Sequence, residues 1–377
     1  MKNIYFEKNS DIQILRAVAI IITLAAHINI LTKKQELLSV MHVYFEYWAG
    51  VDLFFCISGF VITSSLLRQY SESQDIHQKV KNIRNFWIKR FYRIAPSSWL
   101  WLTITLFVAY NLDLQVNESP SEVLRQSLIA FLNLFNFEHT NCLYSDGWHC
   151  TVLGIYWSLS LEEQFYFLFP FVFFFIRHKY LAFILLFVCI LMFFIHRPWP
   201  GLGWSTRIDP VFWGVIIAFF KSSSLSKIME PRFLQNRLTS FLFLIVCILL
   251  LISIPRISPD PQGNILVFET SLIGIICALL VGSASYDGNY FSKKSIITTI
   301  FLWIGSRSYS LYLNHIIIFL IIRDSLNTDQ FIQNSRDFII LTACAISVSC
   351  LLAEGNYRFV ELPLRLKGRQ IVKSLKD

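Results

Sequence analysis

Two ionisable residues, Arg16 and His27, interrupt the first apolar stretch of the chain. In an α-helix their spacing is roughly 20° from a whole number of turns, so both side chains lie on one face, about 16 Å apart along the axis. Ionisable groups in apolar helices are costly and usually face a protein interior or a watery cavity. Imidazole is also the side chain used most often as a general base near neutral pH. We therefore expect this face to be functional.

Two adjacent carboxylates, Glu162 and Glu163, lie in a second apolar run. Neighbouring residues of a helix point about 100° apart, and a charged side chain facing lipid is costly, so we expect at least one of the two carboxylates to meet a polar partner. A glutamate that meets His27 from another helix would orient the imidazole and stabilise its charged form. The sequence thus predicts a catalytic group of His27, Arg16, Glu162 and Glu163.

Arg90 and Arg93 are three residues apart at the start of another apolar stretch. They share a helix face, where two guanidinium groups suit the phosphates of a nucleotide-like ligand. The alternative is ordinary anchoring at the cytoplasmic membrane surface, which the spacing alone favours.

Several other polar residues interrupt apolar stretches toward the predicted outer side, and we expect them to contact substrate. For Asp52 an interfacial position is the alternative, and hydroxyl groups in membrane helices often serve only as interhelical hydrogen-bond donors. Gly59 is expected to allow close helix packing rather than to take part in chemistry. The candidate substrate-binding residues are Asp52, Arg207, Asp209, Tyr309 and His315.

The composition favours a membrane protein, in which these residues are carried by membrane-spanning helices. Of the 377 residues, 55% are hydrophobic and 15% charged, and 35 are Phe; soluble domains carry about 25% charged residues. The fold class predicted is all-α, a polytopic membrane helix bundle with about ten spans of roughly 20 residues each. These spans are expected near 12–32, 50–67, 94–112, 153–176, 180–196, 208–220, 238–254, 265–284, 300–322 and 338–358.

The net charge of +8 comes from basic residues whose positions indicate membrane topology rather than a surface that binds nucleic acid. Basic residues concentrate in alternate connections, of which 68–93 is the richest, and the positive-inside rule places these in the cytoplasm together with both termini. We expect one membrane domain, residues 1–377, in the cell inner membrane, with no nucleic-acid partner. Residues 121–137 form an amphipathic stretch, expected either at the outer interface or packed on the bundle.

Six of the eight cysteines lie in apolar runs, whereas Cys142 and Cys150 lie in a polar loop. If that loop is extracytoplasmic, these two are expected to form a disulfide; the alternative is two free thiols. No metal-binding cysteine spacing is present, and we predict no metal site.

Several strings of the chain together resemble the membrane acyltransferase-3 family of O-acyltransferases. They occur in the order typical of that family over nearly the whole chain, although Asn314 stands where many relatives have Trp. Besides Arg16 with His27 and Arg90 with Arg93, they are GVDLFFCISGFVIT (50–63), YWSLSLEEQFYFLFP (156–170), RIDPVFWG (207–214), SYSLYLNH (308–315) and VELPLR (360–365).

The resemblance implies acyl transfer from acyl-CoA, usually acetyl-CoA, to a carbohydrate hydroxyl. Acceptors in the family include lipopolysaccharide O-antigen, exopolysaccharide, peptidoglycan, lipo-oligosaccharide signals and macrolides. Acyl-CoA is a co-substrate, so no tightly bound cofactor is expected. By resemblance, Arg16 and His27 form the Arg–His motif, and Arg90 and Arg93 serve the acyl-CoA step. A stand-alone form without a fused extracytoplasmic hydrolase-like domain is expected.

A proton-coupled transporter or flippase is the alternative function. Such a carrier of a glycan or small metabolite also needs buried Arg, His, Asp and Glu. Inverted repeats would favour it, and the sequence shows none.

Overall fold

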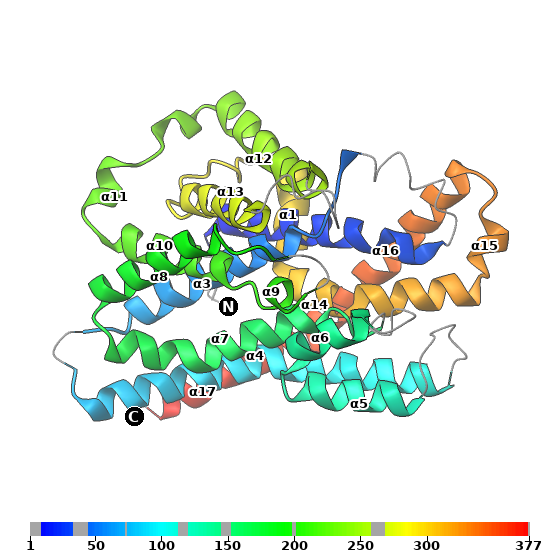
Figure 1. The fold of residues 1–377 in the computed structure, drawn as a ribbon, viewed down its shortest axis with the longest axis horizontal. Coiled ribbons are helices and arrows are strands. Elements are labelled where there is room, and N and C mark those ends of the chain that lie inside the picture. Colours follow the sequence, from blue (N-terminus) through cyan, green and yellow to red (C-terminus); the bar gives the residue numbers. More distant parts are fainter. Residues whose placement is uncertain are drawn as a thin grey trace, which may run out of the picture.

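A computed structural model describes residues 9–32, 44–71, 74–111, 120–144, 152–197, 201–257 and 268–375. Within these ranges the chain forms helices and no strand, which confirms the all-α prediction (Figure 1). The longer helices are α1 (Ser10–His27), α3 (Gly50–Leu67), α4 (Ile76–Asn111), α5 (Pro120–Phe131), α6 (Phe135–Tyr144), α7 (Tyr156–Phe175), α8 (His178–Met192), α10 (Asp209–Ser222), α12 (Arg237–Ile257), α13 (Glu269–Ala284), α14 (Ile296–Ser325), α16 (Ser335–Asn356) and α17 (Leu362–Ser374). Shorter elements are η1 (Ile28–Leu31), α9 (Leu202–Ser205), α11 (Leu225–Ile228), η2 (Arg232–Gln235), α15 (Thr328–Phe331) and the π-helical η3 (Tyr357–Glu361).

Helices α1, α3 and α14 lie at the middle of the bundle, and α1 packs against both of the others (Figure 1). The side chain of Asn9 caps α1 by accepting a hydrogen bond from the backbone of Ile12 at 2.9 Å. Asp11 is fully buried in the first turn and accepts hydrogen bonds from the backbone N–H groups of Tyr290, Phe291 and Ser292, each at 2.9 Å. These bonds fix the start of α1 to the segment before α14.

Glycines allow α3 and α10 to pack backbone against backbone. A Cβ atom added at Gly59 would lie 2.1 Å from the carbonyl oxygen of Val211, and one added at Gly214 would lie 2.1 Å from that of Cys56. Both distances are far below van der Waals contact, so no larger residue fits without moving a helix. The expected packing role of Gly59 is confirmed.

Helix α4 is longer than predicted. A span was expected over 94–112 after a basic connection at 68–93, but the helix runs unbroken from Ile76 to Asn111 through Pro96. Its first half has an inward face, with Asn82, Ile83 and Phe86 buried, and this packing explains why the basic segment is helical. At 1.5 Å per residue the helix is about 54 Å long, which exceeds the roughly 30 Å hydrocarbon core.

A helix occupies each of the ten predicted spans, although 112 and 265–267 lie outside the described residues. Four segments of the described chain are long and apolar enough to cross a membrane, namely Ser10–Leu31, Gly50–Leu67, Arg237–Arg256 and a stretch within Ser335–Ser374. Large apolar side chains such as Phe183, Phe187 and Phe241 are exposed on the outer helices, as a lipid-facing surface requires. The fold is consistent with a membrane helix bundle, and the number of spans stays a prediction.

The amphipathic stretch 121–137 forms two helices, α5 and α6, which separate near Asn133, a residue with a left-handed φ of 56°. Helix α5 packs against α4 and α7, as expected for the alternative in which this stretch covers the bundle. In α6, Cys142 is disulfide-bonded. Its predicted partner Cys150 lies outside the described residues.

Candidate active site

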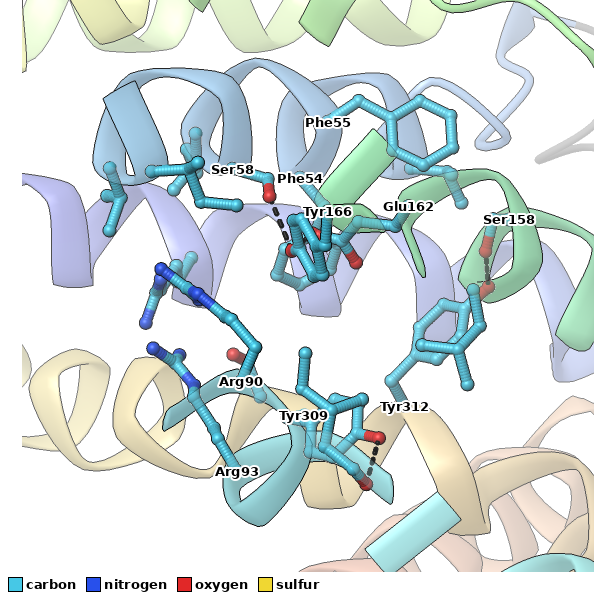
Figure 2. Close-up of a pocket in the computed structure, with 18 residues that line it drawn as sticks. Phe54, Phe55, Ser58, Arg90, Arg93, Ser158, Glu162, Tyr166, Tyr309 and Tyr312 are labelled. Carbon is cyan, nitrogen blue, oxygen red and sulfur yellow. Dashed lines mark hydrogen bonds between the residues drawn. The ribbon is translucent and has the colours of Figure 1, made fainter. Parts of the chain in front are cut away.

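A cavity of about 90 Å³ opens where α1, α3, α4, α7 and α14 meet (Figure 2). We call it the arginine cavity because three guanidinium groups lie in its wall. The volume exceeds the roughly 10–15 Å³ that one water molecule needs. Its lining includes Arg16, Ser58, Arg90, Arg93, Glu162, Tyr166, Ser158, Tyr309 and Tyr312, together with apolar residues of α3.

The three arginines are half-buried and make no hydrogen bond or ion pair with any described residue. Arg16 comes from α1, whereas Arg90 and Arg93 come from successive turns of α4. The guanidinium group of Arg90 lies 5.3 Å from the ring centre of Tyr166 and 5.4 Å from that of Phe86. Figure 2 shows Arg90 and Arg93 pointing toward the same end of the cavity. Partly desolvated cations that no hydrogen bond or ion pair compensates are costly, so this arrangement suits an anionic ligand.

One carboxylate faces these cations. Glu162 accepts a hydrogen bond from the hydroxyl of Tyr166, which lies one turn further along α7. The Tyr166 hydroxyl is also 2.6 Å from Oγ of Ser58 on α3. Since the tyrosine donates its proton to the carboxylate, the serine donates to the tyrosine, and the chain of bonds fixes Glu162 at the cavity wall.

Glu163 does not line the cavity. Its Oε1 atom is buried and has no hydrogen-bond partner among the described residues. A buried oxygen without a partner is rare in folded proteins and is typical of strained or functional positions. A catalytic role for Glu163 therefore stays a prediction.

Helix α14 supplies the hydroxyl groups of Tyr309 and Tyr312 to the cavity wall. Tyr309 donates to the carbonyl of Ile94 at 2.9 Å, which joins α14 to α4. Tyr312 donates to the carbonyl of Ile155 at 3.0 Å and lies 2.5 Å from Oγ of Ser158. Figure 2 shows the Ser158–Tyr312 pair opposite the guanidinium groups.

The two histidines predicted from sequence touch each other. Nε2 of His315 lies 3.2 Å from Nδ1 of His27, with ring centres 5.0 Å apart. His315 is fully buried, and its ring centre is 5.9 Å from that of Tyr312, which lines the cavity. His315 thus contacts Tyr312 of the cavity wall, although neither histidine lines the cavity itself. No carboxylate of the described residues hydrogen-bonds either imidazole, so the partner of His27 is His315 rather than the expected glutamate.

Asp52 and Arg207 form a buried ion pair outside the cavity. Nε and Nη2 of Arg207 donate to the two carboxylate oxygens of Asp52 at 2.8 and 3.0 Å. The guanidinium also lies 3.8 Å from the ring centre of Trp204, 4.7 Å from that of Trp157 and 4.9 Å from that of Trp48. These contacts join α3 to the segment before α10.

Asp209 forms a second pair, with Arg197, at 2.5 and 3.2 Å. Arg197 also donates to Oγ of Ser271 on α13 at 2.8 Å. Neither Asp209 nor Arg197 lines the arginine cavity. In the structure Asp52, Arg207 and Asp209 make contacts between helices, and the substrate contacts expected for them stay predictions.

Sequence reasoning missed Tyr166, Ser158 and Arg197. A signal existed for Tyr166, since it is four residues after Glu162 and such residues are neighbours on a helix surface. Arg197 follows an apolar helix, where it resembles an ordinary interfacial cation. Nothing in the sequence indicates that Ser158 faces Tyr312, because the two residues come from different helices.

Comparisons with known proteins indicate the family of the chain. A family profile described as an acyltransferase domain matches residues 9–354. Peptidoglycan O-acetyltransferase OatA of Listeria monocytogenes is 27% identical over 373 residues, which cover 94% of this chain and 55% of that protein. A putative O-acetyltransferase of Staphylococcus aureus (strain COL) is 29% identical, with coverage of 94% and 57%.

A third relative, putative peptidoglycan O-acetyltransferase YrhL of Bacillus subtilis, is 28% identical over 340 residues, or 85% of this chain and 50% of that protein. The chain thus spans about half the length of the curated relatives it matches. Two of these three names refer to peptidoglycan, and none refers to lipopolysaccharide or O-antigen. No solved structure matches the chain.

Proposed function

The chain belongs to the acyltransferase-3 family, and on that premise we propose that it is a membrane O-acetyltransferase. It takes an acetyl group from acyl-CoA and transfers it to a hydroxyl of a cell-envelope carbohydrate. The observation that carries this proposal is the set of three unpaired guanidinium groups, those of Arg16, Arg90 and Arg93, in one cavity next to the histidine pair. The names of the relatives favour peptidoglycan as the acceptor.

The anionic ligand of the cavity is the phosphate-bearing part of acyl-CoA. Guanidinium groups match phosphate oxygens bidentately and are more weakly hydrated than ammonium groups. The thioester then extends along α14 past Tyr309 and Tyr312 toward His27. Because Arg16 and His27 lie on one face of α1, about 16 Å apart, the same helix contacts both ends of the bound donor.

His27 is the general base. Its Nε2 takes the proton of the acceptor hydroxyl, the hydroxyl oxygen forms the ester bond to the acetyl carbon, and the carbon–sulfur bond of the thioester breaks. The CoA thiolate leaves and receives the proton from the imidazolium. The oxyanion that forms on the carbonyl oxygen is stabilised by a positive group or a hydroxyl donor.

Purified protein in lipid nanodiscs, supplied with acetyl-CoA and peptidoglycan fragments, tests the proposal. We expect CoA thiol release together with an acetyl mass increment on the glycan, and loss of both in His27→Ala. Arg90→Ala and Arg93→Ala should each raise KM for acetyl-CoA about 10- to 100-fold, the equivalent of one charge-assisted hydrogen bond of about 1.5–3 kcal/mol.

Arg84→Ala is the matched control, since Arg84 lies on the same helix but is exposed and outside the cavity. It should leave KM unchanged. An unaltered KM in both cavity variants would contradict the assignment of the phosphate site. Vesicle uptake of glycan without acetyl turnover would instead indicate a carrier.

The proposed topology has ten spans and places both termini in the cytoplasm of a multi-pass inner-membrane protein. The basic residues of the 68–93 segment and of the C-terminal helix α17 support this orientation by the positive-inside rule. It gives acyl-CoA access to Arg90 and Arg93 from the cytoplasm. Reporter fusions after Asp287 and after Asn327 should give cytoplasmic and extracytoplasmic signals respectively, and two signals of one kind would contradict the topology.

A further inference from the structure

Backbone carbonyl groups determine which nitrogen of His315 carries its proton. Nδ1 lies 2.8 Å from the carbonyl oxygen of Tyr312 and 3.1 Å from that of Leu311. A carbonyl oxygen only accepts, so Nδ1 must be the donor. In a neutral imidazole the other nitrogen then carries a lone pair. Nε2 of His315 is therefore an acceptor.

The same reasoning applies to His27. Its Nδ1 lies 2.9 Å from the carbonyl oxygen of Thr23, one turn earlier in α1, and 3.2 Å from Nε2 of His315. Both neighbours are acceptors, so Nδ1 of His27 carries the proton and shares it between them. The lone pair of a neutral His27 is then on Nε2, an atom that no described residue hydrogen-bonds.

The opposite tautomer of His27 is disfavoured at this position. A lone pair on Nδ1 would face the Thr23 carbonyl oxygen and also the lone pair of His315. To donate from Nε2 instead, His315 would have to give up its two backbone bonds or become charged while fully buried. The two neutral tautomers deduced above satisfy every contact of the pair without an ionised group.

We propose that His315 is a positioning residue whose Nε2 accepts the Nδ1 proton of His27 and so keeps the basic lone pair of His27 on Nε2. The inference rests on the proposed function, in which that lone pair takes the proton of the acceptor hydroxyl. When His27 becomes an imidazolium, His315 continues to accept from it. A neutral ring thus does what a carboxylate does in a serine-protease triad.

Three substitutions of His315 separate the hydrogen bond from packing. In His315→Gln the amide oxygen can occupy the position of Nε2, whereas in His315→Asn the shorter amide reaches only the position of Nδ1. His315→Leu fills the space without an acceptor. We expect kcat to fall about 10- to 100-fold in the Leu and Asn variants, as for other residues that orient a reacting group, and to be largely retained with Gln. KM for acetyl-CoA should not change, because His315 does not line the arginine cavity.

A kcat of the Leu variant equal to that of the wild type would overturn the inference. A Gln variant as impaired as the Asn variant, both folded by size-exclusion chromatography, would also overturn it, since packing alone would then explain the loss. If the Leu variant does not fold, the Gln–Asn comparison decides.

A measurement without substrate tests the tautomer itself. Solid-state NMR of protein labelled with the heavy nitrogen isotope in histidine distinguishes protonated from unprotonated ring nitrogens, and the His27→Gln spectrum identifies the His27 signals. We expect unprotonated Nε2 in the wild type; unprotonated Nδ1 would refute the positioning role. This result does not depend on transfer activity, so failure of the proposed function, seen as a wild type without acetyl transfer, is distinguishable from failure of this inference.

Discussion

The Asp52→Asn substitution removes the charge of one side chain in the buried Asp52–Arg207 pair while keeping its shape and one acceptor oxygen. Both side chains are 0% exposed, and two hydrogen bonds of 2.8 and 3.0 Å join them. Nη1 of Arg207 donates to the carbonyl of Trp204 at 2.8 Å, so the guanidinium has no route to water. The variant therefore leaves a buried cation without a counter-ion.

Removing one partner of a buried ion pair typically costs about 3–5 kcal/mol. Arg207 keeps its contacts with three indole rings, and each cation–π contact contributes about 0.5–2 kcal/mol whether or not Asp52 is charged. We therefore expect the lower end of that range, a loss of about 3 kcal/mol in the free energy of unfolding. The double variant with Arg207→Met removes the uncompensated cation and should be less destabilised than the sum of the single variants.

Unfolding in mixed micelles with increasing dodecyl sulfate, followed by circular dichroism, measures these free energies for the purified protein. If Asp52 served substrate binding instead, Asp52→Asn would raise KM for the acceptor without lowering stability. A variant within about 0.5 kcal/mol of the wild type, the usual range for surface substitutions, would refute a structural role for the pair.

Three further predictions concern packing, the cavity and pH. Gly59→Ala should destabilise the protein by about 1–3 kcal/mol, because its Cβ would meet backbone at 2.1 Å, whereas Gly282→Ala meets nothing within 4 Å and should be neutral in the same unfolding assay. Tyr166→Phe removes the donor to Glu162 but keeps the ring beside the cavity arginines, so kcat should fall while KM for acetyl-CoA changes little; equal changes in both would contradict this. Burial lowers the pKa of His139, which lies outside the predicted spans, to about 3. Because the folded protein binds this proton less readily than the unfolded chain, this contribution to the free energy of unfolding is present above about pH 6.5 and falls by about 2 kcal/mol on going to pH 5. His139→Gln should remove this part of the pH dependence. An unchanged fall in the free energy of unfolding between about pH 6.5 and pH 5 in that variant would refute the assignment.

Much of the architecture was predictable because apolar periodicity and length are local properties. Each of the ten predicted spans contains a helix, and α3 has the predicted bounds. The shared face of Arg16 and His27 also followed from helix geometry alone. The extension of α4 to Ile76 was missed because its first half is polar on average. Only contacts with other helices, made through residues such as Phe86, show that this half has a buried face.

The sequence by itself determined the helices, the family motifs and which charged residues lie within the apolar helices. Only the tertiary structure decided their partners: Arg207 contacts Asp52 across 155 positions of the chain, and His315 contacts His27 across 288. A helical period fixes the face on which a side chain lies, but the helix opposite that face depends on how the whole bundle packs. For this reason Asp52 was predicted at a substrate site and lies in an ion pair, while the three arginines of two sequence motifs meet in one cavity.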